Sequence, residues 1–375
     1  MAGNVEVPRL SWQEGGLTHS ALWRAENGAL PPRRIEIADD SLSADAAYRL
    51  VCEGTALLWR GDFQNARLLL DALKRRIERK PRKITAAMPE AFHLHRQAQA
   101  QRARTLGMLL LPLAADYTVP LRRAPEVQVA CLETYGPGAE DSVVSLRELL
   151  SLISAHEWRK KGVMVLPLGA RIHPHYGVFS PVRGEYLDLI QQADLPSTEL
   201  AFDIGTGTGV IAALLAKRGV AQVIATELAP RALACARDNI ARLGYAKKVE
   251  VIEADLFPPG CAPLIVCNPP WLPGKPTSML EHAVYDPDSQ MLRGYLAGLA
   301  EHLTPKGEGW LILSDLAEHL GLRTRTQLLE WIAAAGLRVF GRHNIRPQHP
   351  RSKDASDPLH VARAAEMTTL WRLGA

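Results

Sequence analysis

The stretch LAFDIGTGTGVIAALLAKRG, residues 200–219, joins a short apolar strand to a helix through three alternating glycines. Asp203 ends the strand. Gly205, Gly207 and Gly209 then predict a turn so tight that the backbone can approach a ligand in front of a helix N-terminus. This pattern is typical of nucleotide-binding loops, although a glycine-rich turn with a purely structural role has the same appearance. The surrounding sequence has to decide between the two.

Strands and helices alternate on both sides of this turn, in the part of the chain that we assign to a catalytic domain at 161–375. We expect strands at 200–204, 222–226, 249–253, 262–267, 309–314, 337–344 and 367–373, and helices at 210–218, 230–243, 289–303 and 325–335. Such alternation predicts an α/β fold with a mostly parallel sheet covered by helices on both faces. In that architecture ligands bind beyond the carboxyl ends of the strands.

Two more carboxylates follow strands at this predicted edge. Glu227 ends the second strand, where it can accept hydrogen bonds from the hydroxyls of a ribose, and Asp255 follows the third, where it can accept from the exocyclic amine of adenine. One exposed carboxylate after a strand is usually a solvated helix cap. Three in step, counting Asp203, favour a nucleoside-containing ligand over a structural turn.

The motif Asn268-Pro269-Pro270-Trp271 follows the apolar run at 262–267. An amide or aromatic amine nitrogen is a poor nucleophile, because its lone pair is delocalised. The side-chain oxygen of Asn268 and the carbonyl of Pro269 could orient such a nitrogen and stabilise the positive charge that develops on it. The prolines hold the backbone without adding a donor, and Trp271 offers a face for stacking a planar group. The alternative is a turn that merely ends the strand.

The motifs in this order resemble the class I S-adenosylmethionine-dependent methyltransferases that carry an Asn-Pro-Pro-aromatic motif, and the resemblance covers about 174–373. It implies a Rossmann-like, seven-stranded doubly wound sheet whose last strand is antiparallel. It also implies S-adenosyl-L-methionine as the cofactor. A nicotinamide dehydrogenase, the other nucleotide-binding class with such a loop, gives the NPPW motif no role.

The resemblance also implies roles for single residues. Gly205 and Gly207 would pack against the methionine portion of the cofactor, Glu227 would hold the ribose and Asp255 the adenine. At the last position of the motif, Trp271 replaces the tyrosine or phenylalanine that is usual in the family. This replacement keeps a ring for stacking but changes the size of the pocket. The implied cofactor site comprises Phe179, Asp203, Gly205, Thr206, Gly207, Glu227, Asp255 and Asn268, and the implied catalytic motif comprises Asn268, Pro269, Pro270 and Trp271.

Two resemblances point to different acceptors. Val284 to Pro287 match an element of the protein-glutamine methyltransferases that act on release factors and ribosomal proteins, although the glycine pair that follows this element in those enzymes is missing. The stretch GVFS at 177–180 is similar to the entry of the guanine-N2 ribosomal RNA methyltransferases, in which Phe179 would wall the cofactor; a plain core role is the alternative. We lean to RNA over protein. A cofactor-binding regulator without turnover is a further alternative.

The first half of the chain, 1–160, is expected to form a mainly helical domain that selects the substrate. Helical spacing of apolar residues runs from 41 to 79, and a strand-like stretch spans 108–113. A decayed copy of the catalytic fold is the alternative. A basic tract could bind RNA phosphates or could simply be a solvated helix end; it comprises Lys74, Arg75, Arg76, Arg79, Lys80, Arg82 and Lys83.

Composition limits the remaining functions. Of the 375 residues, 47% are hydrophobic and 22% are charged, as in ordinary globular proteins. The five cysteines lack CxxC spacing, so neither a zinc site nor a disulfide framework is expected. No apolar run reaches the roughly 18 residues of a membrane span, and the start of the chain lacks the pattern of a signal peptide. We therefore expect a cytoplasmic protein with no membrane partner and no metal, and a net charge of +4 that permits an RNA partner without requiring one.

Overall fold

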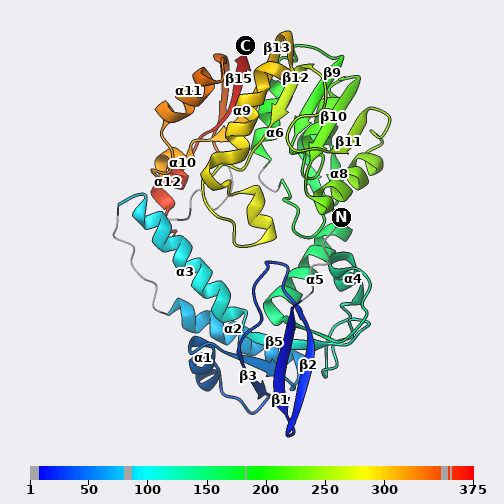
Figure 1. Cartoon of the computed structure of the whole chain (residues 1–375), viewed down its shortest axis with the longest axis vertical. Helices are drawn as coiled ribbons and strands as arrows, with labels where there is room; N and C mark the ends of the chain where they lie inside the picture. Colours follow the sequence, from blue (N-terminus) through cyan, green and yellow to red (C-terminus); the bar gives the residue numbers. More distant parts are fainter. Residues whose placement is uncertain (1–7, 80–86, 182–183, 348–353, 355–356) are drawn as a thin grey trace. The chain divides into compact units, whose positions relative to one another are not determined.

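The computed structural model describes residues 8–79, 87–181, 184–347, 354 and 357–375. The chain divides into two compact units (Figure 1). The first unit comprises Met1–Ile84 and Leu94–Glu157, and the second comprises Thr85–His93 and Trp158–Ala375. The second unit therefore includes a short segment from the first half of the sequence.

The second unit is built on a seven-stranded sheet in the order β11-β10-β9-β12-β13-β15-β14. Of its neighbouring pairs, only the two that involve β15 are antiparallel. The α/β fold class is thereby confirmed. The strands are β9 (Leu200–Ile204), β10 (Gln222–Glu227), β11 (Val249–Glu253), β12 (Ala262–Cys267), β13 (Leu303–Ser314), β14 (Arg338–Ile345) and β15 (Thr368–Gly374).

Helices cover both faces of this sheet. One face packs against α6 (Glu185–Gln192), α7 (Val210–Lys217) and α8 (Pro230–Arg242). The other packs against α9 (Gln290–His302) and α11 (Arg325–Ala334), and Figure 1 shows α9 lying across β12 and β13. The smaller elements are β7 (Val163–Val165), η1 (Leu166–Leu168), β8 (Ala170–Ile172), η2 (Met279–Ala283), η3 (Pro287–Ser289), α10 (Leu316–His319) and α12 (His360–Ala365).

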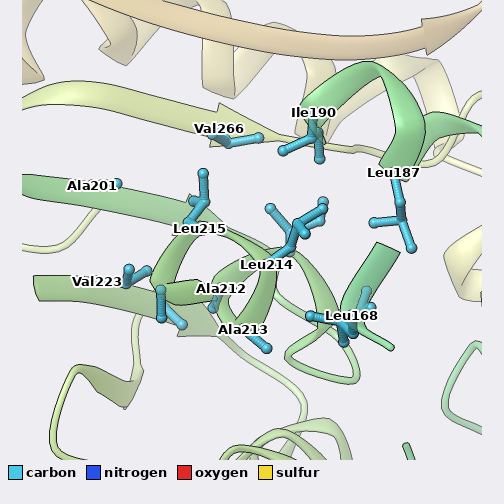
Figure 2. Close-up of a cluster of buried hydrophobic side chains, with 14 of the residues drawn as sticks. Leu168, Leu187, Ile190, Ala201, Ala212, Ala213, Leu214, Leu215, Val223 and Val266 are labelled. Carbon is cyan, nitrogen blue, oxygen red and sulfur yellow. The ribbon is translucent and has the colours of Figure 1, made fainter. Parts of the chain in front are cut away.

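The cores on the two faces follow from the alternation of side chains along each strand. In β9, Ala201 belongs to the core under α6 and α7, whereas Phe202 belongs to the core under α9. In β12, Val266 and Ile265 divide in the same way. Helix α7 lies flat on its face of the sheet, and all but the last of its residues are buried. Figure 2 shows this first core, where Ala212, Ala213, Leu214 and Leu215 of α7 meet Ala201, Val223, Val266, Leu187 and Ile190.

The first unit is also an α/β structure, so the prediction of a mainly helical N-terminal domain is wrong. Its six-stranded mixed sheet has the order β1-β2-β6-β5-β4-β3. The strands are β1 (Arg9–Glu14), β2 (Leu17–Arg24), β3 (Arg34–Ala38), β4 (Thr55–Trp59), β5 (Leu109–Leu113) and β6 (Ser142–Ser145). Its helices are α1 (Ala44–Cys52), α2 (Phe63–Glu78) and α4 (Gln128–Tyr135), together with α3 (Glu90–Leu106) except for its first turn and α5 (Leu146–Lys161) except for its last turn.

Strand β4 explains the error. All five of its residues are buried, and it lies between β3 and β5 with parallel pairing to both. A strand buried on both faces is a continuous apolar run without period-two alternation. Such a run between two amphipathic helices is easily taken for helix, because the helical periodicity continues across it.

Within the described ranges, no helix combines the length and the apolar character needed to cross a lipid bilayer.

We predict that Gly209→Ala destabilises the protein more than Gly244→Ala does. Both glycines have left-handed φ angles, 79° and 78°. A β-carbon on Gly209 would lie 3.3 Å from the backbone of Ala236 in α8, whereas one on Gly244 would meet no described atom within 4 Å. Backbone strain alone should cost about 1–2 kcal/mol in each variant, and crowding should add about 1–3 kcal/mol in Gly209→Ala. Urea unfolding of the two variants measures the difference, and equal losses would contradict the role of close helix packing.

Candidate functional site

Strand register brings three predicted segments to one edge of the sheet. Ile204 of β9 pairs with Thr226 of β10 on one side and with Cys267 of β12 on the other. The next residue along each strand is Gly205 of the glycine turn after β9, Glu227 in β10 and Asn268 after β12. Because β9, β10 and β12 are parallel, their carboxyl ends lie side by side.

Asp203 organises the glycine turn from below. Its carboxylate Oδ2 accepts hydrogen bonds from the Thr206 hydroxyl at 2.6 Å and from the Ala212 backbone N–H at 3.0 Å. The other oxygen, Oδ1, is buried and has no hydrogen-bond partner in the part of the chain that the structure describes. Burial raises the pKa of Asp203 to about 7, and the charge of Glu227 raises it further. A cationic ligand beside the turn would favour the ionised form.

Glu227 joins the second strand to the glycine turn. Its Oε2 accepts from the backbone N–H of Gly207 at 3.1 Å, and its Oε1 accepts from Leu228 at 2.9 Å and Ala229 at 3.0 Å. A carboxylate has about four acceptor positions. Since three are occupied, the structure leaves room on Oε2 for one more donor, such as a single ligand hydroxyl.

The other two residues of the expected cofactor site are less enclosed. Asp255 is exposed, two residues beyond β11. The next residue, Leu256, has a positive φ of 67°, and its carbonyl accepts from the Thr226 hydroxyl at 2.5 Å, which holds this loop against β10. Phe179 is half-buried, and its neighbour Val178 packs on α8. The structure brings Asp203, Thr206, Gly207 and Glu227 into direct contact, but no hydrogen bond or ring contact of the described residues joins Phe179 or Asp255 to them.

The Asn268 amide is held by the indole of the same motif. The Trp271 Nε1–H donates to Asn268 Oδ1 at 2.9 Å. An N–H donor requires an oxygen opposite it, so this bond also settles which amide atom is the oxygen. One lone pair of Oδ1 remains for another donor. Sequence reasoning gave Trp271 only a stacking role, whereas the structure makes it the residue that orients Asn268.

A second chain segment runs alongside the NPPW motif, and we call residues 272–289 the acceptor loop. Leu272 donates to the carbonyl of Val284 at 3.1 Å and accepts from the N–H of Asp286 at 2.9 Å. The buried carboxylate of Asp286 caps α9, accepting from Met291 and Leu292 at 3.1 Å each. Burial raises the pKa of Asp286. The element at 284–287 is therefore structural support for the motif.

Two further residues act on the glycine turn without a signal in the sequence. A β-carbon on Gly205, where φ is 71°, would collide with the Cε methyl of Met291 in α9. On the opposite side of the turn, the buried Asn239 of α8 donates to the carbonyl of Thr208 at 3.0 Å and accepts from the N–H of His173 at 2.7 Å. The turn is thus held between α8 and α9. Its tip is open, since a β-carbon on Gly207 would meet no described atom within 4 Å.

Residues 88–93, at the start of α3, complete the wall behind the acceptor loop. Phe92 is 4% exposed and packs in one apolar cluster with Leu272, Leu316 and Leu320. Its ring centroid lies 6.4 Å from that of Tyr285. This segment belongs to the second unit although it precedes that unit's main part by 65 residues of sequence. Its contribution could not be foreseen from local patterns.

The described residues contain no group of three or more His, Cys, Asp or Glu side chains placed to hold a metal ion. The five cysteines, for their part, are free thiols. Burial raises the pKa of Cys267, at the end of β12, well above its usual value, which makes this thiol unreactive.

We predict that Asp203→Asn makes stability less dependent on pH. The pKa of Asp203 in the folded protein, about 7, lies above that of an unfolded aspartate, about 3.9. The contribution of Asp203 to the free energy of unfolding is therefore fully present below about pH 4. It is lost as the pH rises through about 7, and the loss amounts to up to about 4 kcal/mol. Urea unfolding at about pH 5 and about pH 8 should show a larger drop for the wild type than for the variant. Parallel drops would contradict the raised pKa.

Comparison with known proteins finds methyltransferases whose sequences are similar to part of this chain. Residues 170–323 match the family model described as methyltransferase small domain. A release factor glutamine methyltransferase of Cereibacter sphaeroides is 37% identical over 165 residues, which are 42% of this chain and 56% of that protein. A tRNA1(Val) (adenine(37)-N6)-methyltransferase of Bacteroides thetaiotaomicron is 30% identical over 140 residues, 34% of this chain and 57% of that protein.

A third relative matches over a longer stretch. It is a tRNA1(Val) (adenine(37)-N6)-methyltransferase of Shewanella amazonensis, 27% identical over 220 residues, which are 52% of this chain and 92% of that protein. Of the first two relatives, by contrast, this chain spans little more than half the length. These matches make residues 170–323 similar to the methyltransferase small domain, and this stretch contains the glycine turn and the NPPW motif.

Proposed function

We propose that this protein is an S-adenosyl-L-methionine-dependent N-methyltransferase that moves a methyl group to a planar amine or amide nitrogen of a macromolecule. The observation that carries the proposal is the Asn268 amide, which Trp271 holds at the end of β12, next to the strand that leads into the glycine turn. The relatives support the kind of acceptor, since one is named for glutamine and the others for the N6 amine of adenine. Both nitrogens are planar and weakly nucleophilic.

The proposed cofactor site fits the chemistry of its ligand. S-adenosyl-L-methionine supplies an electrophilic methyl group on a positively charged sulfur. A positively charged ligand would favour the ionised form of Asp203, whose Oδ1 has no hydrogen-bond partner among the described residues, and the open space at Gly207 allows close approach. We assign Gly205, Thr206 and Gly207 to the methionine portion, with Asp203 supporting them. Glu227 is assigned to one ribose hydroxyl.

The rest of the cofactor site is assigned by position. Asp255 stands at the third strand end and is exposed, so it can reach the exocyclic amine of the adenine. Phe179 is assigned to the wall of the site because the connector that carries it packs on α8 through Val178.

The NPPW motif would hold the acceptor nitrogen. The free lone pair of Asn268 Oδ1 and the carbonyl of Pro269 accept the N–H groups of the acceptor and aim its lone pair at the methyl group. As the new bond forms, positive charge develops on nitrogen, and the same two oxygens stabilise it. Pro270 keeps the turn rigid, and the face of Trp271 stacks against the planar group. The proton can leave after the transfer, so no strong base is needed.

We infer that the acceptor is RNA, with ribosomal RNA as the first candidate. The first unit would help to select this RNA. The reaction would take place in the cytoplasm. Within the basic tract, Arg75 and Arg79 are exposed, which suits contact with phosphates. Lys74 and Arg76 are instead paired with Asp71 at 2.9 Å and with Asp45 at 2.8 Å. The tract's other members, Lys80, Arg82 and Lys83, lie outside the described residues.

The second candidate is a glutamine side chain of a release factor or ribosomal protein. The observation in its favour is the pairing of Leu272 with the element at 284–287, which resembles the protein-glutamine methyltransferases. Asp288 and Ser289, which follow this element, have positive φ angles of 53° and 54° without being glycines. The chain therefore adopts here a backbone conformation that glycine tolerates best, but with residues that strain it.

Replacing Asn268 separates binding from chemistry. Because we assign the Asn268 oxygen to the acceptor nitrogen and not to the cofactor, we expect Asn268→Ala to keep the cofactor affinity of the wild type. Methyl transfer should fall by a factor of about 10² or more, because a positioned hydrogen-bond acceptor is removed. Trp271→Phe keeps a stacking ring but removes the N–H that orients Asn268, so kcat should fall more than KM rises. Calorimetry of cofactor binding and radiolabel transfer measure both effects. Transfer at the wild-type rate in Asn268→Ala would contradict the proposal.

The acceptor is identified by labelling. Purified protein and tritiated cofactor are added to an extract of cells that lack the enzyme, and the labelled product is digested with RNase or with protease. We expect RNase to release the label, and expect Arg75→Gln with Arg79→Gln to weaken RNA binding and to reduce its dependence on salt. The matched control is Lys74→Gln with Arg76→Gln, which alters already paired residues and should have less effect. Label released only by protease would make glutamine the acceptor.

A further inference from the structure

Arg323 is a buried cation at the same edge of the sheet as the NPPW motif. It lies between α10 and α11 and is 3% exposed. Its backbone N–H donates to the carbonyl of Ala317 at 3.3 Å, so the loop folds back on α10. Helix α10 directly follows β13, whose neighbour β12 carries Asn268 at its end. The residue therefore belongs to the neighbourhood of the proposed acceptor site.

The guanidinium of Arg323 has donors but no acceptors. Nε, Nη1 and Nη2 are all shielded, and none has a hydrogen-bond partner anywhere in the described ranges. Other arginines of this unit are treated differently. Arg218, also largely covered, donates to the carbonyls of Ile190 and Ala193. Arg325 donates from Nε to Glu318 at 2.7 Å.

An unpaired buried guanidinium destabilises a fold. Burial lowers the pKa of Arg323, yet a guanidinium stays protonated under all ordinary conditions. The charges of Glu318 and, more weakly, Asp286 offset this desolvation only in part, and no oxygen of the described residues accepts from its N–H groups. Groups held in an unfavourable state of this kind are concentrated at functional sites, where a ligand relieves them.

Arg323 is coupled to the acceptor loop through Asp286. Each of the two side chains acts on the charge of the other, but they form no hydrogen bond. The Asp286 carboxylate is already engaged by the N–H groups of Met291 and Leu292. Its backbone N–H donates to Leu272, the residue after Trp271. The unsatisfied donors thus lie near the chain that carries the NPPW motif.

We propose that Arg323 binds a phosphate oxygen of the acceptor molecule while the acceptor nitrogen is held at Asn268. The proposal rests on the N-methyltransferase function and makes a nucleotide the class of acceptor. A guanidinium presents two parallel N–H groups that match two oxygens of a phosphate. A glutamine in a peptide would bring only neutral carbonyls to this place. The phosphate would accept hydrogen bonds from the N–H groups of Arg323 and would also offset the positive charge of its guanidinium.

Access to Arg323 requires the packing around it to open. The acceptor loop ends in Asp288 and Ser289, two consecutive non-glycine residues in the left-handed region. Strained residues of this kind persist only when surrounding contacts hold them, and their relaxation favours movement. They closely follow Asp286, whose charge acts on Arg323.

Thermal unfolding of the whole chain tests the unpaired state. Arg323→Met removes the charge and keeps an unbranched side chain, so it should raise Tm by about 3 °C or more without ligand. The matched control is Arg325→Met, which breaks the ion pair with Glu318 and should leave Tm unchanged or lower it. If Arg323→Met lowers Tm, Arg323 has a structural partner and the proposal is overturned.

Inorganic phosphate and RNA test the ligand. Phosphate, compared with chloride at equal ionic strength, should raise the Tm of the wild type and not that of Arg323→Met. In methyl transfer to RNA, Arg323→Met should raise KM about tenfold or more, which is about 1.4 kcal/mol, with unchanged cofactor affinity. Equal phosphate shifts or an unchanged KM would overturn the proposal. A wild type that methylates no acceptor would refute the proposed function instead, while the phosphate comparison would still decide the role of Arg323.

Discussion

The site depends first on the two hydrogen bonds that Asp203 Oδ2 accepts at the end of β9. They tie Thr206 of the glycine turn and Ala212 in the first turn of α7 to one buried carboxylate, so that the turn folds over the end of its own strand. The N–H of Gly207 is thereby presented to Glu227 of the next strand. The carboxyl ends of the parallel strands lie at one edge of the sheet, and the Asp203 carboxylate fixes the conformation of the turn at that edge.

The fold of the second half was predictable because each of its signals is local. Alternating apolar segments, glycines between strand and helix, and polar residues after strands are all visible within short windows. The first half lacks such signals. Its strand β4 is a short apolar run between two helices, and burial on both faces removes the alternation that would have marked it. The unit's sheet emerges only from pairing between distant segments.

The residues of the proposed site could be named from the sequence, but their contacts could not. Asn268, Trp271 and Glu227 could be named from spacing, whereas the bond from the indole to the amide depends on side-chain rotamers. The contact of Met291 with Gly205 and the cap that Asp286 provides depend on where α9 packs. The unsatisfied guanidinium of Arg323 is a property of its tertiary surroundings, and an arginine in a polar stretch of sequence gives no hint of it.

The position of Phe92 has a consequence for how the two halves of the chain can evolve. The second unit is discontinuous, since residues from the start of α3 fill an apolar space between the acceptor loop and α10. A fragment that begins after the first half would expose Leu272 and Leu320 to water. The first half therefore cannot be exchanged freely for another domain. A replacement domain would have to supply an apolar side chain that fills the space now occupied by Phe92.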